Sequence, residues 1–186
     1  MKIPALILSA TLSICFTASG QSNQHQVNQG PDGAPQVSQK DKLFLHAIAS
    51  EDQSEIDLAK LALQKTTNAQ IQQYAKSKIL AADPDMEKDA MQVAQQNHAT
   101  ISSKPNAAAQ RQYQIFKTLS ENEFDKAYSR YEDRMQAADL KVVTREAGAA
   151  INPQVRSYAQ KEVTPVKLAA DAARQLAQAM NVSKTS

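Results

Sequence analysis

Apolar residues recur at every third or fourth position along most of the chain beyond residue 40, and this spacing constrains the fold more than any other feature. In the first such segment the apolar positions are Phe44, Ile48, Leu58 and Ala62, which share one face of an α-helix. No segment alternates apolar and polar residues as a half-buried strand does. Only four glycines occur in 186 residues, as expected of a helical protein. The sequence therefore predicts an all-α fold.

Capping residues and prolines divide this region into helices. The first helix is predicted over residues 41–65, and Asn68 offers an N-cap for the second. Asp83-Pro84 interrupts the second helix, because proline lacks an amide donor and clashes with the preceding turn. Two outcomes fit this pair: a kink near Pro84, or a new helix that Asp83 caps with Pro84 at its first position.

A short extra helix is predicted over residues 106–118, before the third long helix. Ser120 and Glu123 form a capping-box pattern, in which each side chain accepts a hydrogen bond from the other residue's amide. The helix that follows presents one stripe of apolar residues: Phe124, Tyr128, Tyr131, Met135, Ala138 and Val142. This stripe is expected to face the core.

The last long helix is predicted to begin at Asn152-Pro153 and to be kinked at Pro165. Each of the four long helices has an apolar stripe that must be covered, and packing against the other three covers it most simply. The sequence therefore predicts an antiparallel four-helix bundle over residues 41–181, followed by a flexible tail at 182–186.

The N-terminal segment 1–20 has the features of an export signal. Lys2 precedes an apolar run over residues 3–16, and Ala18-Ser19-Gly20 provides the small residues of a cleavage site. The run is shorter than the roughly 20 apolar residues of a membrane span. We therefore expect an exported protein, periplasmic or associated with the outer membrane. The polar segment 21–40 is expected to be a disordered linker.

The only cysteine, Cys15, lies inside this signal. Leu12-Ser13-Ile14-Cys15 loosely resembles a lipobox, in which Cys15 would be acylated and tether the chain to a membrane. Ile14 argues against acylation, because the residue before such a cysteine is small. We favour cleavage after Gly20, which would leave a mature chain without a disulfide, a thiol nucleophile or a cysteine-based metal site.

Three groups of residues resemble those of a known family. They are Ser54-Glu55-Ile56-Asp57-Leu58-Ala59-Lys60-Leu61-Ala62, Phe124-Asp125-Lys126-Ala127-Tyr128 and Asn152-Pro153-Gln154-Val155. In this order they resemble the opening helix, the Phe-Asp-x-x-Tyr signature and the closing helix of the bacterial domain-of-unknown-function family 4142. The resemblance implies a ferritin-like helical bundle, often labelled an outer-membrane protein, with no established biochemical role.

The chain departs from this family at its histidines. Family members usually carry Asp-His pairs in the second and third helices and a histidine in the last. The corresponding positions here are Ala81-Ala82, Met135-Gln136, and Ala169 or Ala170, so all three histidines are missing. If these histidines bind a ligand in relatives, this chain is expected to have lost that ligand.

Four charged side chains are predicted on the inward faces of the helices. Glu51 and Glu55 fall on the stripe of the first helix, Lys78 on that of the second, and Glu162 on that of the last. A buried charge is costly unless it is paired or bound to a metal ion. The three glutamates are therefore metal-ligand candidates, and Lys78 is a candidate partner for a buried ion pair.

The ion pair is the interpretation we favour. A ferritin-type site takes a glutamate from each of two helices and Glu-x-x-His from the other two, and this chain has no Glu-x-x-His. A site made of oxygen ligands alone would favour magnesium, calcium or manganese over iron. Pairing of Lys78 with Glu51, Glu55 or Glu162 needs no metal.

No complete catalytic set is present. The serines lie mostly in caps, loops and the tail, and no histidine has an acidic residue on a matching face. Basic and acidic residues nearly balance, 21 against 19, without the basic stripe of a nucleic-acid-binding protein. We expect a non-enzymatic exported bundle without a cofactor, which acts by binding or as a structural component of the envelope. The alternative is a ferritin-like, carboxylate metal-binding or stress-related protein.

Overall fold

Residues 37–181, which the computed structural model describes, form helices joined by turns and loops, and this range contains no strand. The prediction of an all-α fold is confirmed. The predicted signal with Cys15, nearly all of the predicted linker and the predicted tail at 182–186 lie outside the described residues. No helix within 37–181 is both long and apolar enough to cross a membrane.

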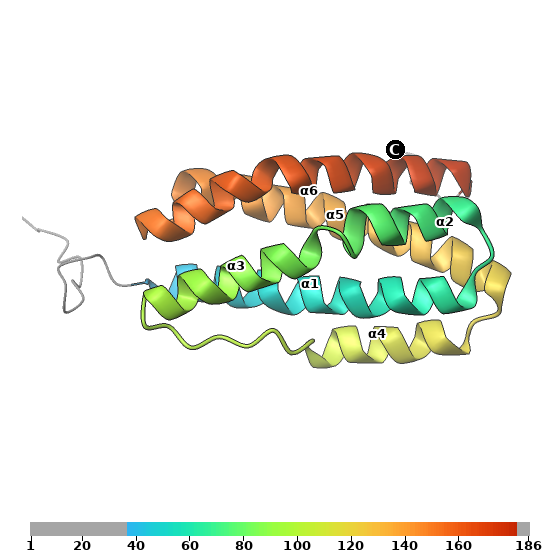
Figure 1. Ribbon diagram of the computed structural model, residues 1–186, viewed down its shortest axis with the longest axis horizontal. Helices are drawn as coiled ribbons and strands as arrows, with labels where there is room; N and C mark the ends of the chain where they lie inside the picture. The colour runs from blue at the N-terminus through green and yellow to red at the C-terminus, as the bar shows by residue number, and fades with distance from the viewer. Residues whose placement is uncertain (1–36, 182–186) are drawn as a thin grey trace, which may run out of the picture.

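The helices form long rods that run back and forth beside one another. Their bounds are α1 (Gln39–Lys65), α2 (Ala69–Tyr74), the π-helix η1 (Ala75–Ile79), α3 (Asp83–Gln96), α4 (Ala107–Thr118), α5 (Glu121–Ala149) and α6 (Pro153–Ala179). The chain passes along α1, returns through α2, η1 and α3, and later runs along α5 and back along α6 (Figure 1). This arrangement is compatible with the predicted helical bundle.

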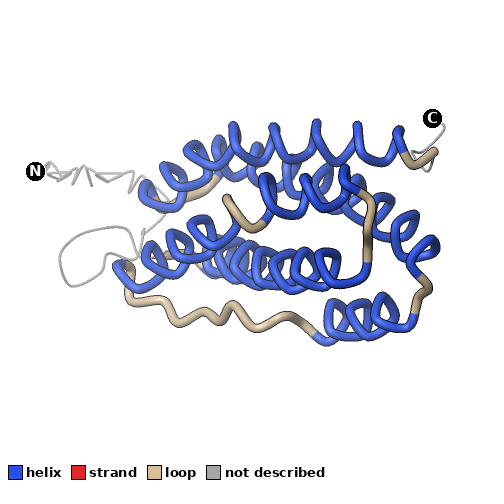
Figure 2. The backbone as a smooth tube through the Cα atoms, turned by 45° about the vertical axis from the view of Figure 1, so that its right-hand side comes forward, coloured by secondary structure: helices blue, strands red, loops and turns tan. Residues whose placement is uncertain are grey.

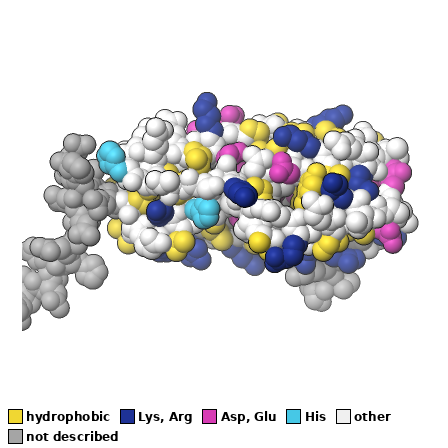
Figure 3. Space-filling view, turned by 90° about the horizontal axis from the view of Figure 1, so that it is seen from below, with side chains coloured by type: hydrophobic (Ala, Val, Ile, Leu, Met, Phe, Trp, Pro, Cys, Tyr) yellow, Lys and Arg dark blue, Asp and Glu magenta, His cyan; other side chains and the backbone are white. Residues whose placement is uncertain are grey.

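Two pairs of rods make the most extensive contacts. α3 packs against α1, and α6 packs against α5. The shorter helix α4 lies along the outside of α1 and reaches α5 through a turn (Figures 1 and 2). On the face seen in Figure 3, lysine and arginine side chains are spread among uncharged ones rather than gathered into one patch.

Side-chain caps explain where the helices begin. The predicted capping box of α5 is present, with the Ser120 amide donating to the Glu123 carboxylate at 3.1 Å. A second capping box, between Ser38 and Asp41, starts α1 two residues earlier than predicted. The Asp41 carboxylate also accepts from the amides of Ile151 and Asn152, each at 3.1 Å. Asp41 therefore joins the start of α1 to the turn between α5 and α6.

The interruption near Pro84 is a new helix rather than a kink. α3 begins at Asp83, with Pro84 in its first turn, where the missing proline amide costs nothing. Asp83 is the first helical residue and not the cap, since Ala82 occupies the capping position. The preceding π-helix η1 was not predicted from the sequence. At Pro165, α6 continues without a break from residue 153 to 179.

The core consists of two apolar clusters, one toward each end of the bundle. One contains Leu58, Ile71 and Phe124, and the other contains Phe44, Ile48 and Val155. The rods pass from one cluster to the other through a central zone. Acidic side chains occupy this zone, and they form the candidate functional site.

Candidate functional site

Six acidic residues from three helices surround the centre of the bundle, and we call them the acidic cluster. They are Glu51, Asp52 and Glu55 of α1, Asp83 of α3, and Glu132 and Asp139 of α5. All except the half-buried Glu51 are at least nine-tenths buried. Both packed helix pairs, α1 with α3 and α5 with α6, contribute acidic residues, so the cluster forms only when the two pairs come together.

Helical spacing explains why these acids point inward. On α1, Asp52 and Glu55 lie three residues apart, between Ile48 of one apolar cluster and Leu58 of the other. Positions three and four apart share a helix face, so acids on this face are buried together with the apolar residues. Asp83 is held inward in the same way, between Ile79 and Met86.

A small cavity lies within the acidic cluster, and we call it the central cavity. Its volume is about 20 Å³, which is enough for roughly one water molecule or one monatomic ion. The polar side chains that line it are those of Glu51, Asp52, Glu55, Lys78, Asp83, Gln136 and Asp139. Acidic oxygens therefore dominate its polar surface.

Only part of the acidic cluster is satisfied by hydrogen bonds. Gln136 Nε2 donates to Glu55 Oε2 at 2.5 Å, and the Tyr74 hydroxyl donates to Glu132 Oε2 at 3.1 Å. Four buried oxygens have no hydrogen-bond partner among the described residues: Asp52 Oδ2, Glu55 Oε1, Asp83 Oδ2 and Glu132 Oε1. A buried polar atom without a partner costs about 1–3 kcal/mol, and more when it is charged.

Burial and mutual repulsion shift the ionisation of these acids. Burial raises the pKa of Glu55 well above its ordinary value, and the charges of Glu132 and Asp83 raise it further. Burial, followed by the charge of Glu132, raises the pKa of Asp83 to about 8, although hydrogen bonding with Glu55 opposes this rise. Burial also raises the pKa of Glu132 to about 8, although the hydrogen bond from Tyr74 opposes the rise.

Burial and neighbouring negative charges also raise the pKa values of Asp139 and Asp52. Burial raises the pKa of Asp139 well above its ordinary value, and the neighbouring Glu51 adds to the effect. Asp52 is raised well above its ordinary pKa by burial and then by the charge of Asp83. The acidic cluster can therefore hold protons near neutral pH, or it can hold a cation that replaces them.

The glutamates singled out in the sequence have different surroundings. Glu55 is 4% exposed and lines the central cavity, and the half-buried Glu51 lines it as well. Glu162 is 2% exposed but does not line the cavity, and the nearest ammonium, that of Lys161, lies 3.6 Å from its Oε1. Only two of the three glutamates therefore lie at the central cavity.

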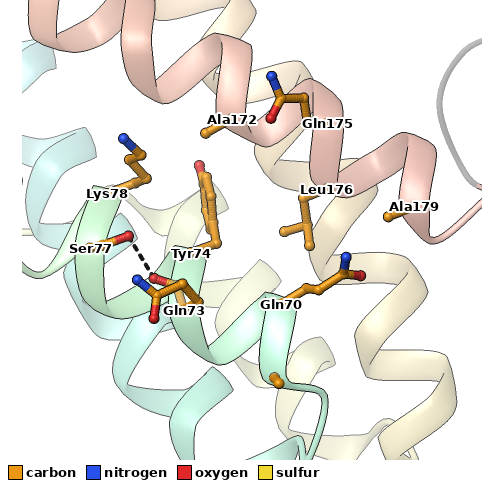
Figure 4. A pocket seen from close by; sticks show the side chains of 10 residues that line it. Gln70, Gln73, Tyr74, Ser77, Lys78, Ala172, Gln175, Leu176 and Ala179 are labelled. Atoms are coloured by element: carbon orange, nitrogen blue, oxygen red, sulfur yellow. Dashed lines mark hydrogen bonds between the residues drawn. The ribbon is translucent and has the colours of Figure 1, made fainter.

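The expected ion pair of Lys78 is not formed within residues 37–181. Lys78 is half-buried on η1, and none of the observed ion pairs includes it. Its side chain lines both the central cavity and a surface groove of about 520 Å³ between α2–η1 and α6. Figure 4 shows Lys78 at one side of this groove, opposite Leu176.

Sequence reasoning missed four acids of the cluster, namely Asp52, Asp83, Glu132 and Asp139. On α5 the predicted stripe followed apolar residues to Ala138 and Val142, which are exposed and half-buried, respectively. The buried positions instead continue through Glu132, Gln136, Asp139 and Val143. Extending the spacing from Phe124 and Tyr128 without regard to polarity would have found them, because a helix repeats every 3.6 residues or so.

The residues present do not fit the ferritin type of metal centre. Such a centre requires histidine ligands, and the two described histidines, His46 and His98, are exposed. Nor do any three acidic or histidine side chains within residues 37–181 converge closely enough to hold a metal ion without moving. The family resemblance implies histidines at Ala82, at Gln136 and at Ala169 or Ala170, and of these four positions Ala82, Gln136 and Ala169 line the central cavity.

Comparison with known proteins identifies one relationship. A family model described as "Domain of unknown function (DUF4142)" matches residues 26–176. No curated protein and no solved structure matches the chain significantly. The family match includes every residue of the acidic cluster, and it extends into the segment predicted to be a linker.

Proposed function

The chain belongs to the DUF4142 family, and from this premise we propose that it is an exported, non-enzymatic protein that acts by binding at the centre of its helical bundle. The observation that carries the proposal is the size and chemistry of the central cavity. A volume of about 20 Å³ admits an ion or a water molecule, whereas pockets for organic ligands are typically about 300 Å³ or more.

The described histidines also support a non-enzymatic role. His46 is exposed, unlike the buried acidic cluster, and its Nδ1 lies 2.8 Å from the backbone oxygen of Ser102. His98 is exposed at the end of α3. Neither histidine is placed to activate a serine hydroxyl, which nucleophilic catalysis of that type requires.

Export can be tested directly on the full-length chain. We expect expression in a bacterial host to deliver the protein to the periplasmic or outer-membrane fraction, with an intact mass that begins at Gln21. A mass that begins at an acylated Cys15 would support a membrane tether instead. Full-length, uncleaved protein in the cytosol would overturn the proposal of export.

A ferritin-like metal-handling role is the second candidate, although the exposure of both described histidines argues against it. The observation that favours it is the contribution of carboxylates from both packed helix pairs to one centre. Ferritin-type chemistry oxidises iron(II), so oxygen consumption by the exported protein after iron(II) addition measures it. Oxidation that is lost in a Glu55→Gln variant would favour this candidate, whereas oxidation no faster than in buffer would rule it out.

A further inference from the structure

Three deeply buried carboxylates at the central cavity are only partly satisfied by the protein. Asp52, Glu55 and Asp83 are 7%, 4% and 4% exposed, and each has one oxygen without a hydrogen-bond partner among the described residues. All three side chains line the cavity. Buried charges persist in proteins when they are paired or coordinate a metal ion.

Another buried glutamate in the same protein shows what compensation looks like. Glu146 is 0% exposed, and its carboxylate lies 2.7 Å from Arg145 Nε and 3.1 Å from Lys40 Nζ. No lysine or arginine within residues 37–181 forms such a pair with any member of the acidic cluster. Buried oxygens without a hydrogen-bond partner also occur on Asp125, Glu146 and Glu162, but only at the centre of the bundle do several of them line one cavity within residues 37–181.

Resting on the proposed binding function, we propose that the central cavity binds one hard divalent cation, of the class of Ca²⁺, Mg²⁺ and Mn²⁺, through the free oxygens of Asp52, Glu55 and Asp83. The available ligands are carboxylate and amide oxygens, without imidazole or thiolate at the cavity; the one cationic side chain that lines it, that of half-buried Lys78, also lines the surface groove and can turn toward it. Oxygen ligands of this kind select hard cations. The cavity volume of about 20 Å³ limits the site to one ion.

The proposed binding requires the carboxylates to move toward one point. Glu55 and Asp83 already lie within hydrogen-bonding reach of each other, on the packed helices α1 and α3. No three acids converge on one point as they stand, which is the arrangement expected of like charges that repel one another. A divalent cation reverses this repulsion, so the carboxylates move toward the shared ion.

The structure also offers a path to the site. Glu51 and Glu55 line the central cavity, and they also line an open surface pocket of about 210 Å³ between α1, α4 and α5. A hydrated cation can enter this pocket, exchange water for the half-buried Glu51 carboxylate and pass inward to Glu55. Negative charge along such a path raises the local cation concentration.

The test uses the exported protein after its metals have been removed with EDTA. Chloride salts of Ca²⁺, Mg²⁺ and Mn²⁺ are titrated separately near neutral pH, by calorimetry and by thermal unfolding. We expect one ion per chain and a rise in Tm of about 5–10 °C at a concentration about 100 times the Kd. The salt with the lowest Kd identifies the preferred ion.

Two matched variants make the test specific. Glu55→Gln should weaken binding at least about tenfold and remove the rise in Tm, while the metal-free variant stays folded because an amide of the same size replaces a buried acid. Glu146→Gln alters an equally buried glutamate outside the cluster, so we expect it to retain the affinity even if its Tm is lower.

Two results would overturn the cation site. One is an unchanged Tm with all three salts up to about 10 mM, above the usual Kd range of extracellular calcium sites. The other is unchanged affinity in Glu55→Gln. In either case the export experiment still decides independently whether the protein is exported, because it measures location and mass rather than binding.

Discussion

Raising the pH should destabilise the cation-free protein across a range in which most proteins are stable. Burial raises the pKa of Glu132 to about 8 from an ordinary value of 4.5, and that of Asp83 to about 8 from 3.8. At a pH between the ordinary pKa and the raised pKa of about 8, the folded chain keeps protons that the unfolded chain has released. Stability therefore is highest near the unfolded pKa values and falls as the pH rises toward 8.

The magnitude follows from the number of protons that the folded state retains. One retained proton lowers the free energy of unfolding by about 1.4 kcal/mol per pH unit. From about pH 5 to about pH 7.5 this amounts to roughly 3 kcal/mol. A loss of this size is a large part of the roughly 5–15 kcal/mol that stabilises a typical domain. Two fully retained protons would double this loss in the free energy of unfolding.

Urea unfolding in EDTA, followed by circular dichroism at constant ionic strength, measures this slope. Glu132→Gln should reduce this slope by about 1.4 kcal/mol per pH unit, because the amide does not titrate and its oxygen can still accept from Tyr74. Glu87→Gln provides a matched control, since Glu87 lies outside the acidic cluster and should leave the slope intact. A free energy of unfolding that is constant or rises between about pH 5 and pH 7.5 would refute the reasoning.

Three further substitutions test other parts of the structure by thermal or urea unfolding. Phe116 is the one buried residue of α4 and packs edge-on against Phe124, with the two ring centroids 5.6 Å apart. Phe116→Ala should therefore lower the free energy of unfolding by about 3–5 kcal/mol. A loss below about 1 kcal/mol would mean that the packing of α4 does not depend on this side chain. Asp41→Ala should lower the free energy of unfolding by about 2–4 kcal/mol, because it removes the capping box of α1 and the carboxylate that accepts from the amides of Ile151 and Asn152. An unchanged stability would contradict the role of Asp41 in joining α1 to the turn between α5 and α6. Lys78→Met should change stability by less than about 0.5 kcal/mol, because Lys78 forms no ion pair; a large loss would reveal a pairing in solution.

The helices and their boundaries were largely predictable because they depend on local chemistry. The capping box at Ser120, the N-cap at Asn68 and the start of the last helix at Asn152-Pro153 all follow from neighbouring residues. The start of α1 was missed by two residues because Ser38 lies in a polar stretch that resembles linker. The π-helix η1 was missed because nothing in its sequence distinguishes it from α-helix.

The acidic cluster was predictable only in part. Glu55 was identified because it lies among apolar residues on the face of α1 that enters the core. Glu132 and Asp139 were missed because the expected stripe followed polarity and drifted away from the buried face of α5. Asp83 was considered only as a possible helix cap beside a kink at Pro84, whereas it is buried in the first turn of the new helix.

The sequence by itself determined the helical character of this protein, the positions of most helix ends and the family to which it belongs. These features arise from spacing, capping and motifs that act over a few residues. Only the tertiary structure decided which acids meet, that Lys78 forms no ion pair with them, and that one ion-sized cavity lies between them. The axial positions and rotations of the packed helices control these contacts, and they are set by the two apolar clusters together rather than by any single segment.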